Sequence, residues 1–252
     1  MAADGTSSPT ARPAARATTV LWDIDGTLVK SGGVAARAFL DAVAEVTGSR
    51  PSNERRDYGG RLDTEIADML LRAVNADLAL VPDVLKVLER LTGERLADLR
   101  AQTSAYPGIE ALLATLANAG VRQTVVTGNI AAIARHKLDA GGLVPPIDLG
   151  FGGFGDSAPD RAAVARFALD RLAEAGWEPD PQQVWIVGDT PRDLACARAV
   201  GIRCALVATG RRGIDELNGL GADIVLPDLS DPRPLLDLWG LTRLPSVADL
   251  TH

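Results

Sequence analysis

Six short runs of apolar and β-branched residues, most followed closely by Gly, Asp, Asn or Pro, constrain the fold of this 252-residue chain more than any other feature. Short, largely apolar runs of this kind are typical of strands buried on both faces of a parallel sheet. They occupy residues 19–22, 124–126, 147–149, 184–187, 202–207 and 224–226. Helical patterns separate most of them, at residues 109–119, 130–138 and 162–175. This alternation predicts an α/β fold with a doubly wound, mostly parallel sheet.

About a hundred residues separate the first run from the second, which is far more than one crossover connection needs. Apolar side chains recur there at helical spacing, with no strand pattern among them, at residues 34–47, 64–75 and 81–99. We therefore expect residues 31–104 to form an all-helical cap inserted into a core domain of residues 18–30 and 105–235. Residues 1–17 are expected to be a disordered leader and residues 236–252 a C-terminal tail.

In open α/β sheets, ligands bind beyond the carboxyl ends of the strands, so the residues that follow each run are candidates for function. Asp23 and Asp25 follow the first run, and the two-residue period of a strand would point both carboxylates the same way if that strand continued. Gly26 then allows the chain to turn and is also expected to take part in phosphate binding. These residues predict an acidic end to the first strand.

The second and fourth runs also end in polar residues. Thr127, Gly128 and Asn129 combine a hydroxyl with backbone N–H groups near a helix start, which can bind phosphate, although Thr127 and Asn129 could also cap that helix. Asp189 and Asp193 follow the fourth run, and Asp193 could instead be a surface helix residue. Several carboxylates at one sheet edge would repel one another without a cation, and oxygen ligands favour Mg²⁺.

Three motifs in this order, D-I-D-G-T-L, V-V-T-G-N and V-G-D-T-P-R-D, resemble those of the haloacid dehalogenase (HAD) superfamily over residues 19–228. The inserted cap is similar to the small helical cap of its phosphoglycolate phosphatase and β-phosphoglucomutase group. The resemblance implies a phosphorylated nucleophile at Asp23 and a general acid and base at Asp25. It also implies Mg²⁺ held by Asp23, the backbone carbonyl of Asp25 and Asp189, with support from Asp193. Because dehalogenases of the superfamily lack the second acid, Asp25 favours phosphoryl transfer.

The third motif departs from the family pattern, which has a Lys-Pro that steadies the nucleophile and the phosphate. The corresponding region reads G-F-G-D-S-A-P-D-R, and the chain's three lysines, at positions 30, 86 and 137, do not follow the third run. Arg161 supplies a cation there, and it keeps the positive charge with a different reach and geometry. We expect Arg161 to replace the lysine; the alternative is a solvated helix residue.

The cap sequence Y-G-G-R-L-D-T-E-I occupies the place of the family's substrate-specificity loop. Its glycines would let Arg61 or Asp63 reach over the active site, where Arg61 could bind an anionic or hydroxylated leaving group. A solvated loop charge is the alternative for Arg61.

These observations predict a Mg²⁺-dependent phosphatase acting on a small phosphorylated metabolite, of the phosphoglycolate or sugar-phosphate type, through a phosphoaspartyl intermediate. A phosphomutase of the β-phosphoglucomutase type would share every core residue. A catalytically weak phosphate-binding or regulatory protein is the third possibility, suggested by the missing motif lysine.

Composition supports a small-molecule enzyme. The net charge of −7 argues against nucleic acid or an anionic membrane as partner. No stretch approaches the roughly 18 apolar residues of a membrane span, and a cytoplasmic location is expected. Cys196 and Cys204 sit in apolar surroundings that fit reduced core thiols, and the two histidines, His136 and His252, lack partners for zinc chemistry or a Ser-His-Asp triad.

Overall fold

The computed structural model describes residues 18–52 and 57–242, and its centre is a five-stranded parallel sheet. The strands are β1 (Thr19–Trp22), β4 (Arg122–Val125), β5 (Val184–Gly188), β6 (Arg203–Val207) and β7 (Ile224–Leu226). Their order across the sheet is β4-β1-β5-β6-β7, and β1 pairs in register with β4 and β5. The fold class expected from the sequence is confirmed, and β1, the strand directly before Asp23, lies between two others.

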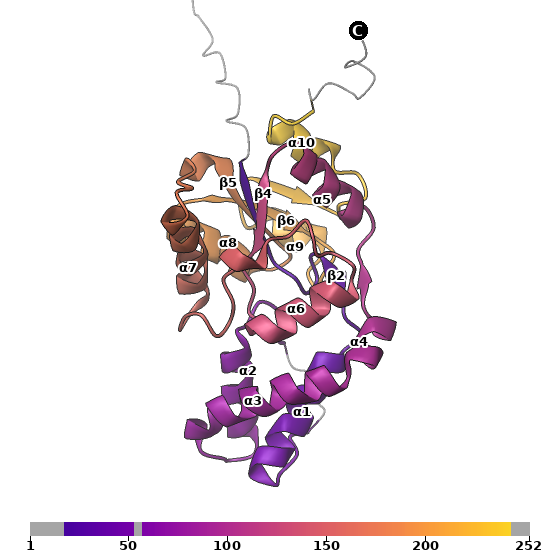
Figure 1. Ribbon diagram of the computed structural model, residues 1–252, viewed down its shortest axis with the longest axis vertical. Helices are drawn as coiled ribbons and strands as arrows, with labels where there is room; N and C mark the ends of the chain where they lie inside the picture. The colour runs from indigo at the N-terminus through magenta and orange to yellow at the C-terminus, as the bar shows by residue number, and fades with distance from the viewer. Residues whose placement is uncertain (1–17, 53–56, 243–252) are drawn as a thin grey trace, which may run out of the picture.

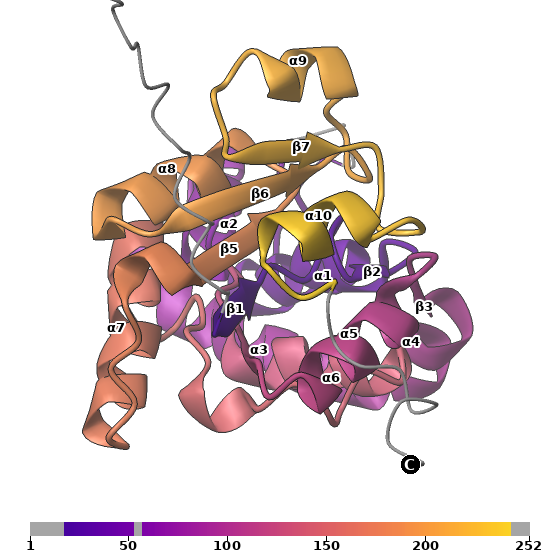
Figure 2. The same cartoon turned by 90° about the horizontal axis from the view of Figure 1, so that it is seen from above.

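Helices cover both faces of the sheet (Figures 1 and 2). Alternate strand residues serve different faces: Val20 and Trp22 pack on one side and Leu21 on the other. The first face is covered by α5 (Ile109–Asn118), α6 (Ala131–Ala140) and α10 (Arg233–Leu238). The second is covered by α7 (Arg161–Glu174), α8 (Pro191–Val200) and α9 (Ile214–Asn218). Burial on both faces explains why the strands read as short apolar runs.

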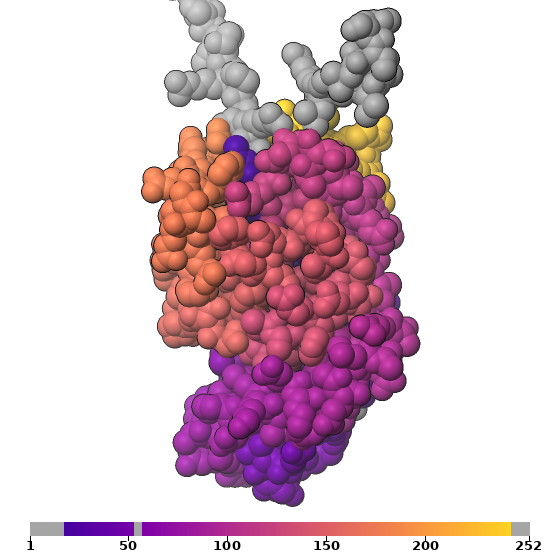
Figure 3. Space-filling model, in the orientation of Figure 1, coloured from indigo at the N-terminus to yellow at the C-terminus, as the bar shows by residue number. Residues whose placement is uncertain are grey.

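The inserted segment forms a helical cap at one end of the molecule (Figure 3). It contains α1 (Val34–Thr47), α2 (Asp63–Ala73), the 3₁₀ turn Leu78–Leu80, α3 (Val81–Glu94) and α4 (Leu96–Gln102). The apolar faces of α1, α2 and α3 bury one another, and Ile130 and Ile133 of the core join that cluster. The cap therefore has its own hydrophobic core and rests on α6.

A two-stranded antiparallel ribbon joins the cap to the core. It consists of β2 (Val29–Lys30) and β3 (Ser104–Ala105), with Val29 opposite Ala105 and Lys30 opposite Ser104. The chain thus enters and leaves the cap at neighbouring, paired residues.

Two expectations about elements are wrong. Residues 147–149 form no strand: the Asp148 side chain accepts a hydrogen bond from the N–H of Gly150, and a 3₁₀ turn, Leu149–Phe151, follows. This turn and the glycines after it leave only an isolated bridge between Val126 and Gly153. The single helix expected at residues 81–99 is instead two helices, because the backbone leaves helical geometry at Arg95.

Core packing continues beyond residue 235, because Trp239 and Leu241 are buried against the first face of the sheet. The expected leader, residues 1–17, and the end of the expected tail, residues 243–252, lie outside the described residues. Among the residues that the structure describes, no helix is both long and apolar enough to cross a bilayer.

Candidate active site

A cavity of about 1050 Å³ lies between the carboxyl edge of the sheet and the cap. Core residues that line it follow four different strands, namely Asp23, Thr127, Asp189 and Thr209. The cap contributes apolar side chains such as Phe39 and Ile66 together with the loop before α2. The structure therefore brings the strand-end residues singled out from the sequence into one cavity.

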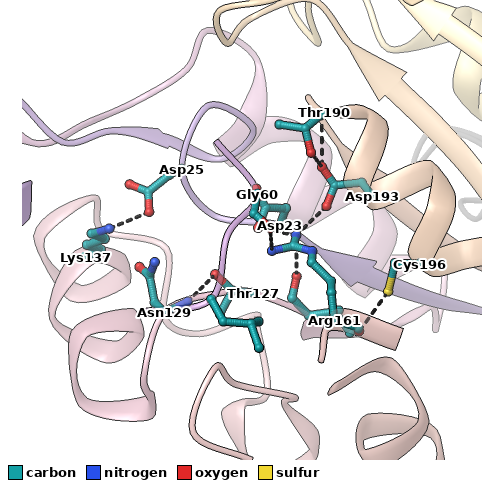
Figure 4. Close-up of polar contacts among 12 residues, drawn as sticks. Asp23, Asp25, Gly60, Thr127, Asn129, Lys137, Arg161, Thr190, Asp193 and Cys196 are labelled. Carbon is teal, nitrogen blue, oxygen red and sulfur yellow. Dashed lines mark hydrogen bonds and ion pairs between the residues drawn. The ribbon is translucent and has the colours of Figure 1, made fainter. Parts of the chain in front are cut away.

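Asp23 lies at the bottom of this cavity, directly after β1, and is 4% exposed. Its backbone N–H donates to Val187, which fixes it against the neighbouring strand β5. The Arg161 guanidinium donates to its Oδ1 at 2.8 Å (Figure 4). Arg161 begins α7, where Asp160 caps the helix, and a further guanidinium N–H lies 3.5 Å from the carbonyl of Gly60 in the cap. A cation thus stands beside Asp23 at the position where the family pattern has a lysine.

Asp193 is completely buried at the third position of α8. One of its oxygens pairs with Arg161, and the other accepts hydrogen bonds from the backbone N–H and the hydroxyl of Thr190. Asp193 is therefore no surface residue: it caps its own helix and holds Arg161 toward Asp23.

The carboxylates of Asp23, Asp189 and Asp193 offer ligand atoms within 4.8 Å of one another. The Asp189 Oδ1 atom is buried and has no hydrogen-bond partner among the described residues. A Cβ atom at Gly26 would lie 2.5 Å from Asp189 Oδ2, and one at Gly210 would lie 1.6 Å from it, so both glycines make room for this carboxylate. This unpaired buried oxygen, close to two further carboxylates, fits a site for a hard cation such as Mg²⁺.

Burial and the neighbouring charges shift the pKa values of the carboxyl groups in this cluster. Burial raises the pKa of Asp189 to about 9, with the charges of Asp23 and Asp193 acting in the same direction. Burial also raises the pKa of Asp23 to about 7, although Arg161 opposes this increase. A bound cation would favour the ionised form of both groups.

Asp25 also lines the cavity, but its carboxylate faces a different way. The strand ends at Trp22 and the chain turns, so Asp25 does not continue the strand's alternation. Its Oδ2 pairs with Lys137 of α6, and its Oδ1 accepts a hydrogen bond from Ser31 at 3.0 Å. Burial raises the pKa of Asp25, but the charge and hydrogen bond of Lys137, with hydrogen bonds from Asn129 and Ser31, outweigh burial and leave this pKa below its ordinary value.

The sequence did not lead us to Lys137 as a site residue. We noted only that this lysine does not lie in the third motif. A signal was available, because Lys137 shares the buried face of α6 with Ile133, Ala134 and Leu138. A lysine on the apolar face of a helix needs an acidic partner.

Thr127, Gly128 and Asn129 form the loop between β4 and α6 and line the cavity. The Thr127 hydroxyl accepts a 3.3 Å hydrogen bond from the N–H of Asn129 and does not cap α6, whose N-cap position is Ile130. Asn129 Oδ1 is buried without a partner among the described residues. The loop thus presents polar groups to the cavity.

The cap loop before α2 packs against this strand-end loop. The Asp63 N–H donates to the carbonyl of Gly128 at 2.7 Å, and the Asp63 carboxylate accepts from the N–H of Ile130 at 2.8 Å. Burial raises the pKa of Asp63 to about 7. Arg61 lines the cavity, while its Nε donates to the carbonyl of Asp57 within the cap. Of the two residues expected to reach over the site, Asp63 contacts the core directly.

Comparison with known proteins agrees with this architecture. The family model described as haloacid dehalogenase-like hydrolase matches residues 20–198. A phosphoglycolate phosphatase of Rhodospirillum rubrum is 33% identical over 239 residues, which are 88% of this chain and 95% of that protein. Among solved structures, a CbbY mutant from Rhodobacter sphaeroides in complex with xylulose-(1,5)bisphosphate has a TM-score of 0.67 and 22% identity, covering 85% of this chain and 96% of that one. A putative β-phosphoglucomutase from Bacteroides vulgatus has a TM-score of 0.66 and 17% identity, covering 91% of each chain.

A parallel α/β core with an acidic strand edge beneath an inserted helical cap defines a class of capped hydrolases. The chain belongs to the haloacid dehalogenase-like hydrolase family. It is an enzyme, a phosphoric monoester hydrolase, and the family expected from its motifs is confirmed.

Proposed function

We propose that this enzyme is a Mg²⁺-dependent phosphatase that hydrolyses a small phosphorylated metabolite through a phosphoaspartyl intermediate on Asp23. The observation that carries the proposal is the buried Asp23 carboxylate, which lies beside Arg161 in a cavity between the core and the cap. A substrate of the phosphoglycolate type is supported by the name of the Rhodospirillum rubrum relative, and sugar phosphates also fit the cavity's size.

Asp23 and Asp189 would hold the Mg²⁺ ion together with the backbone carbonyl of Asp25. Asp193 would support the metal site without binding the ion directly, because its two oxygens already contact Arg161 and Thr190. When bound, Mg²⁺ would neutralise charge on the phosphoryl oxygens.

The reaction would have two displacements at phosphorus. The Asp23 carboxylate attacks and the bond to the leaving alcohol breaks. Asp25, which has to be protonated at this step although Lys137 lowers its pKa, gives its proton to the departing oxygen. Water then attacks the phosphoaspartate and gives a proton to Asp25, which releases inorganic phosphate and restores both carboxyl groups. Asp25 thus returns to the state in which the cycle began.

Phosphate would bind among Arg161, Thr127, Gly128 and Asn129. Arg161 supplies positive charge next to Asp23, and the loop supplies a hydroxyl, an amide and backbone N–H groups. Gly26, expected to bind phosphate, is supported here chiefly as the residue that makes room for Asp189. Arg61 would contact the part of the substrate that faces the cap.

The test is phosphate release from a panel of small phosphorylated metabolites, with Mg²⁺ and with EDTA, for wild type, Asp23→Asn and the exposed-site control Asp170→Asn. We expect metal-dependent release by wild type and the control, and loss by at least about 1000-fold in Asp23→Asn because the nucleophile is removed. Appreciable turnover by Asp23→Asn would overturn the nucleophile assignment. Product analysis by ³¹P NMR separates phosphatase from mutase, because a mutase yields an isomeric ester instead of inorganic phosphate.

A further inference from the structure

Asp25 is held in one orientation from three sides. Lys137 pairs with Oδ2 from the core helix α6, and Ser31 donates to Oδ1 from the linker that leads into the cap. Asn129 adds a side-chain hydrogen bond from the loop after β4. The Asp25 side chain is nevertheless 40% exposed, so it is fixed in place and still open to the cavity.

Lys137 is unusual among the lysines of this chain. All three lie in the described residues; Lys30 and Lys86 are exposed, whereas Lys137 is 4% exposed. Burying an ammonium group is costly unless a negative partner compensates it. Asp25 is that partner, so the pair fixes the positions of both groups.

Two cations of the site, Arg161 and Lys137, contact different carboxylates of the first strand end. Arg161 contacts Asp23, and Lys137 contacts Asp25. Figure 4 shows Asp25 turned toward Lys137 and Asp23 turned toward Arg161. Asp25, the proposed acid and base, is therefore oriented away from Asp23, the proposed nucleophile.

We propose that Lys137 is a positioning residue for Asp25, which holds that carboxyl group where it meets the oxygen of the leaving group. This inference rests on the proposed phosphatase function. Lys137 acts through Asp25, so its loss will matter for esters whose leaving oxygen needs a proton. An alkoxide needs that proton, whereas a p-nitrophenolate leaves without it.

The experiment compares the best alkyl phosphate of the panel with p-nitrophenyl phosphate, for wild type, Lys137→Met, Lys137→Arg and the exposed control Lys86→Met. Lys137→Met should slow release of the leaving group from the alkyl ester in a single turnover by about 100-fold, the lower range for general acid catalysis. On p-nitrophenyl phosphate the pre-steady-state burst of p-nitrophenolate should slow by less than about fivefold. Both rates report the first displacement alone, so they do not depend on the second displacement, in which Asp25 accepts a proton whichever ester was used. Lys137→Arg should recover part of the activity on the alkyl ester because it retains the ion pair.

A double variant keeps the test decisive if Lys137→Met alone fails to fold, because Asp25→Asn together with Lys137→Met removes both charges of the ion pair. Compared with Asp25→Asn, the double variant should show no further loss on the alkyl ester. A further loss, or an equal slowing by Lys137→Met of leaving-group release from both esters, would overturn the positioning role alone. Failure of wild type to hydrolyse either ester would overturn the proposed function and this inference with it.

Discussion

Residue by residue, three of the four acidic groups of the candidate site have side-chain donors, and Asp23 and Asp193 share one of them. Asp23 has Arg161, Asp25 has Lys137, and Asp193 has Thr190 and Arg161. Asp189 is different, since one of its oxygens has no partner among the described residues. A bound cation would therefore stabilise Asp189 more than the other three carboxylates.

Replacement of Arg161 tests its proposed role beside Asp23. Arg161→Met should lower kcat by at least about 100-fold, because Asp23 and the transferred phosphoryl group lose their nearby positive charge. Arg161→Lys should retain more activity than Arg161→Met, since it keeps the charge but not the forked contacts to both Asp23 and Asp193. Steady-state kinetics with Arg166→Met, an exposed arginine on the same helix, provides the control. Wild-type rates in Arg161→Met would remove Arg161 from the catalytic group.

At the scale of elements, the seat of the cap depends on close backbone contact. A Cβ atom at Gly128 would lie 1.9 Å from the carbonyl oxygen of Arg61, and the backbone cannot yield as a flexible side chain would. The loops that carry Asp63 and Thr127 can therefore pack together only with glycine at this position.

Gly128→Ala should lift the cap loop from the core. We expect kcat/KM to fall by about tenfold or more, because displacements near 1 Å misalign catalytic groups. Trypsin should also cleave after Arg61 faster than in wild type. Gly213→Ala, where an added Cβ meets nothing within 4 Å, should change neither quantity. If Gly128→Ala matches wild type in both, the seated cap loop has no part in catalysis.

The elements that the sequence predicted best are those whose pattern is local. The ends of β1, β4 and β5 could be located because glycine, threonine and aspartate interrupt apolar runs. The 147–149 segment could not be assigned from its apolar residues, because the turn at Asp148 depends on the following glycines. The contacts of Lys137 with Asp25 and of Asp63 with Ile130 join residues far apart in the chain, so spacing alone could not reveal them.

For the whole molecule, the buried acids link stability to pH. Asp23, Asp63 and Asp189 have pKa values of about 7, 7 and 9, above the ordinary 3.8, so the metal-free folded state binds more protons than the unfolded state. Their contribution to the free energy of unfolding is therefore largest below pH 4 and is lost as the pH rises through 7 and 9.

Mg²⁺ should oppose this loss. We expect saturating Mg²⁺ to raise Tm more at pH 8 than at pH 6, because the ion binds the ionised carboxylates of the folded state. The extra rise should be ~2–4 °C for each kcal/mol by which Mg²⁺ stabilises the folded state more at pH 8 than at pH 6. Thermal denaturation with Mg²⁺ and with EDTA measures the difference. Asp189→Asn should remove it, and Asp170→Asn should not. An increment that is equal at both pH values, or that persists in Asp189→Asn, contradicts the assignment of Asp189 to the cation.

The ribbon of β2 and β3 also bears on how such a molecule can change over evolution. Because Lys30 and Ser104 are cross-strand partners, the ends of the intervening 31–103 segment are already side by side. A whole domain can be exchanged at this junction for a shorter or longer one, without a new path for the chain and without altering the parallel sheet. The strand-end carboxylates and the helical cap that covers them thus belong to two separate parts of the chain, joined at two adjacent residues.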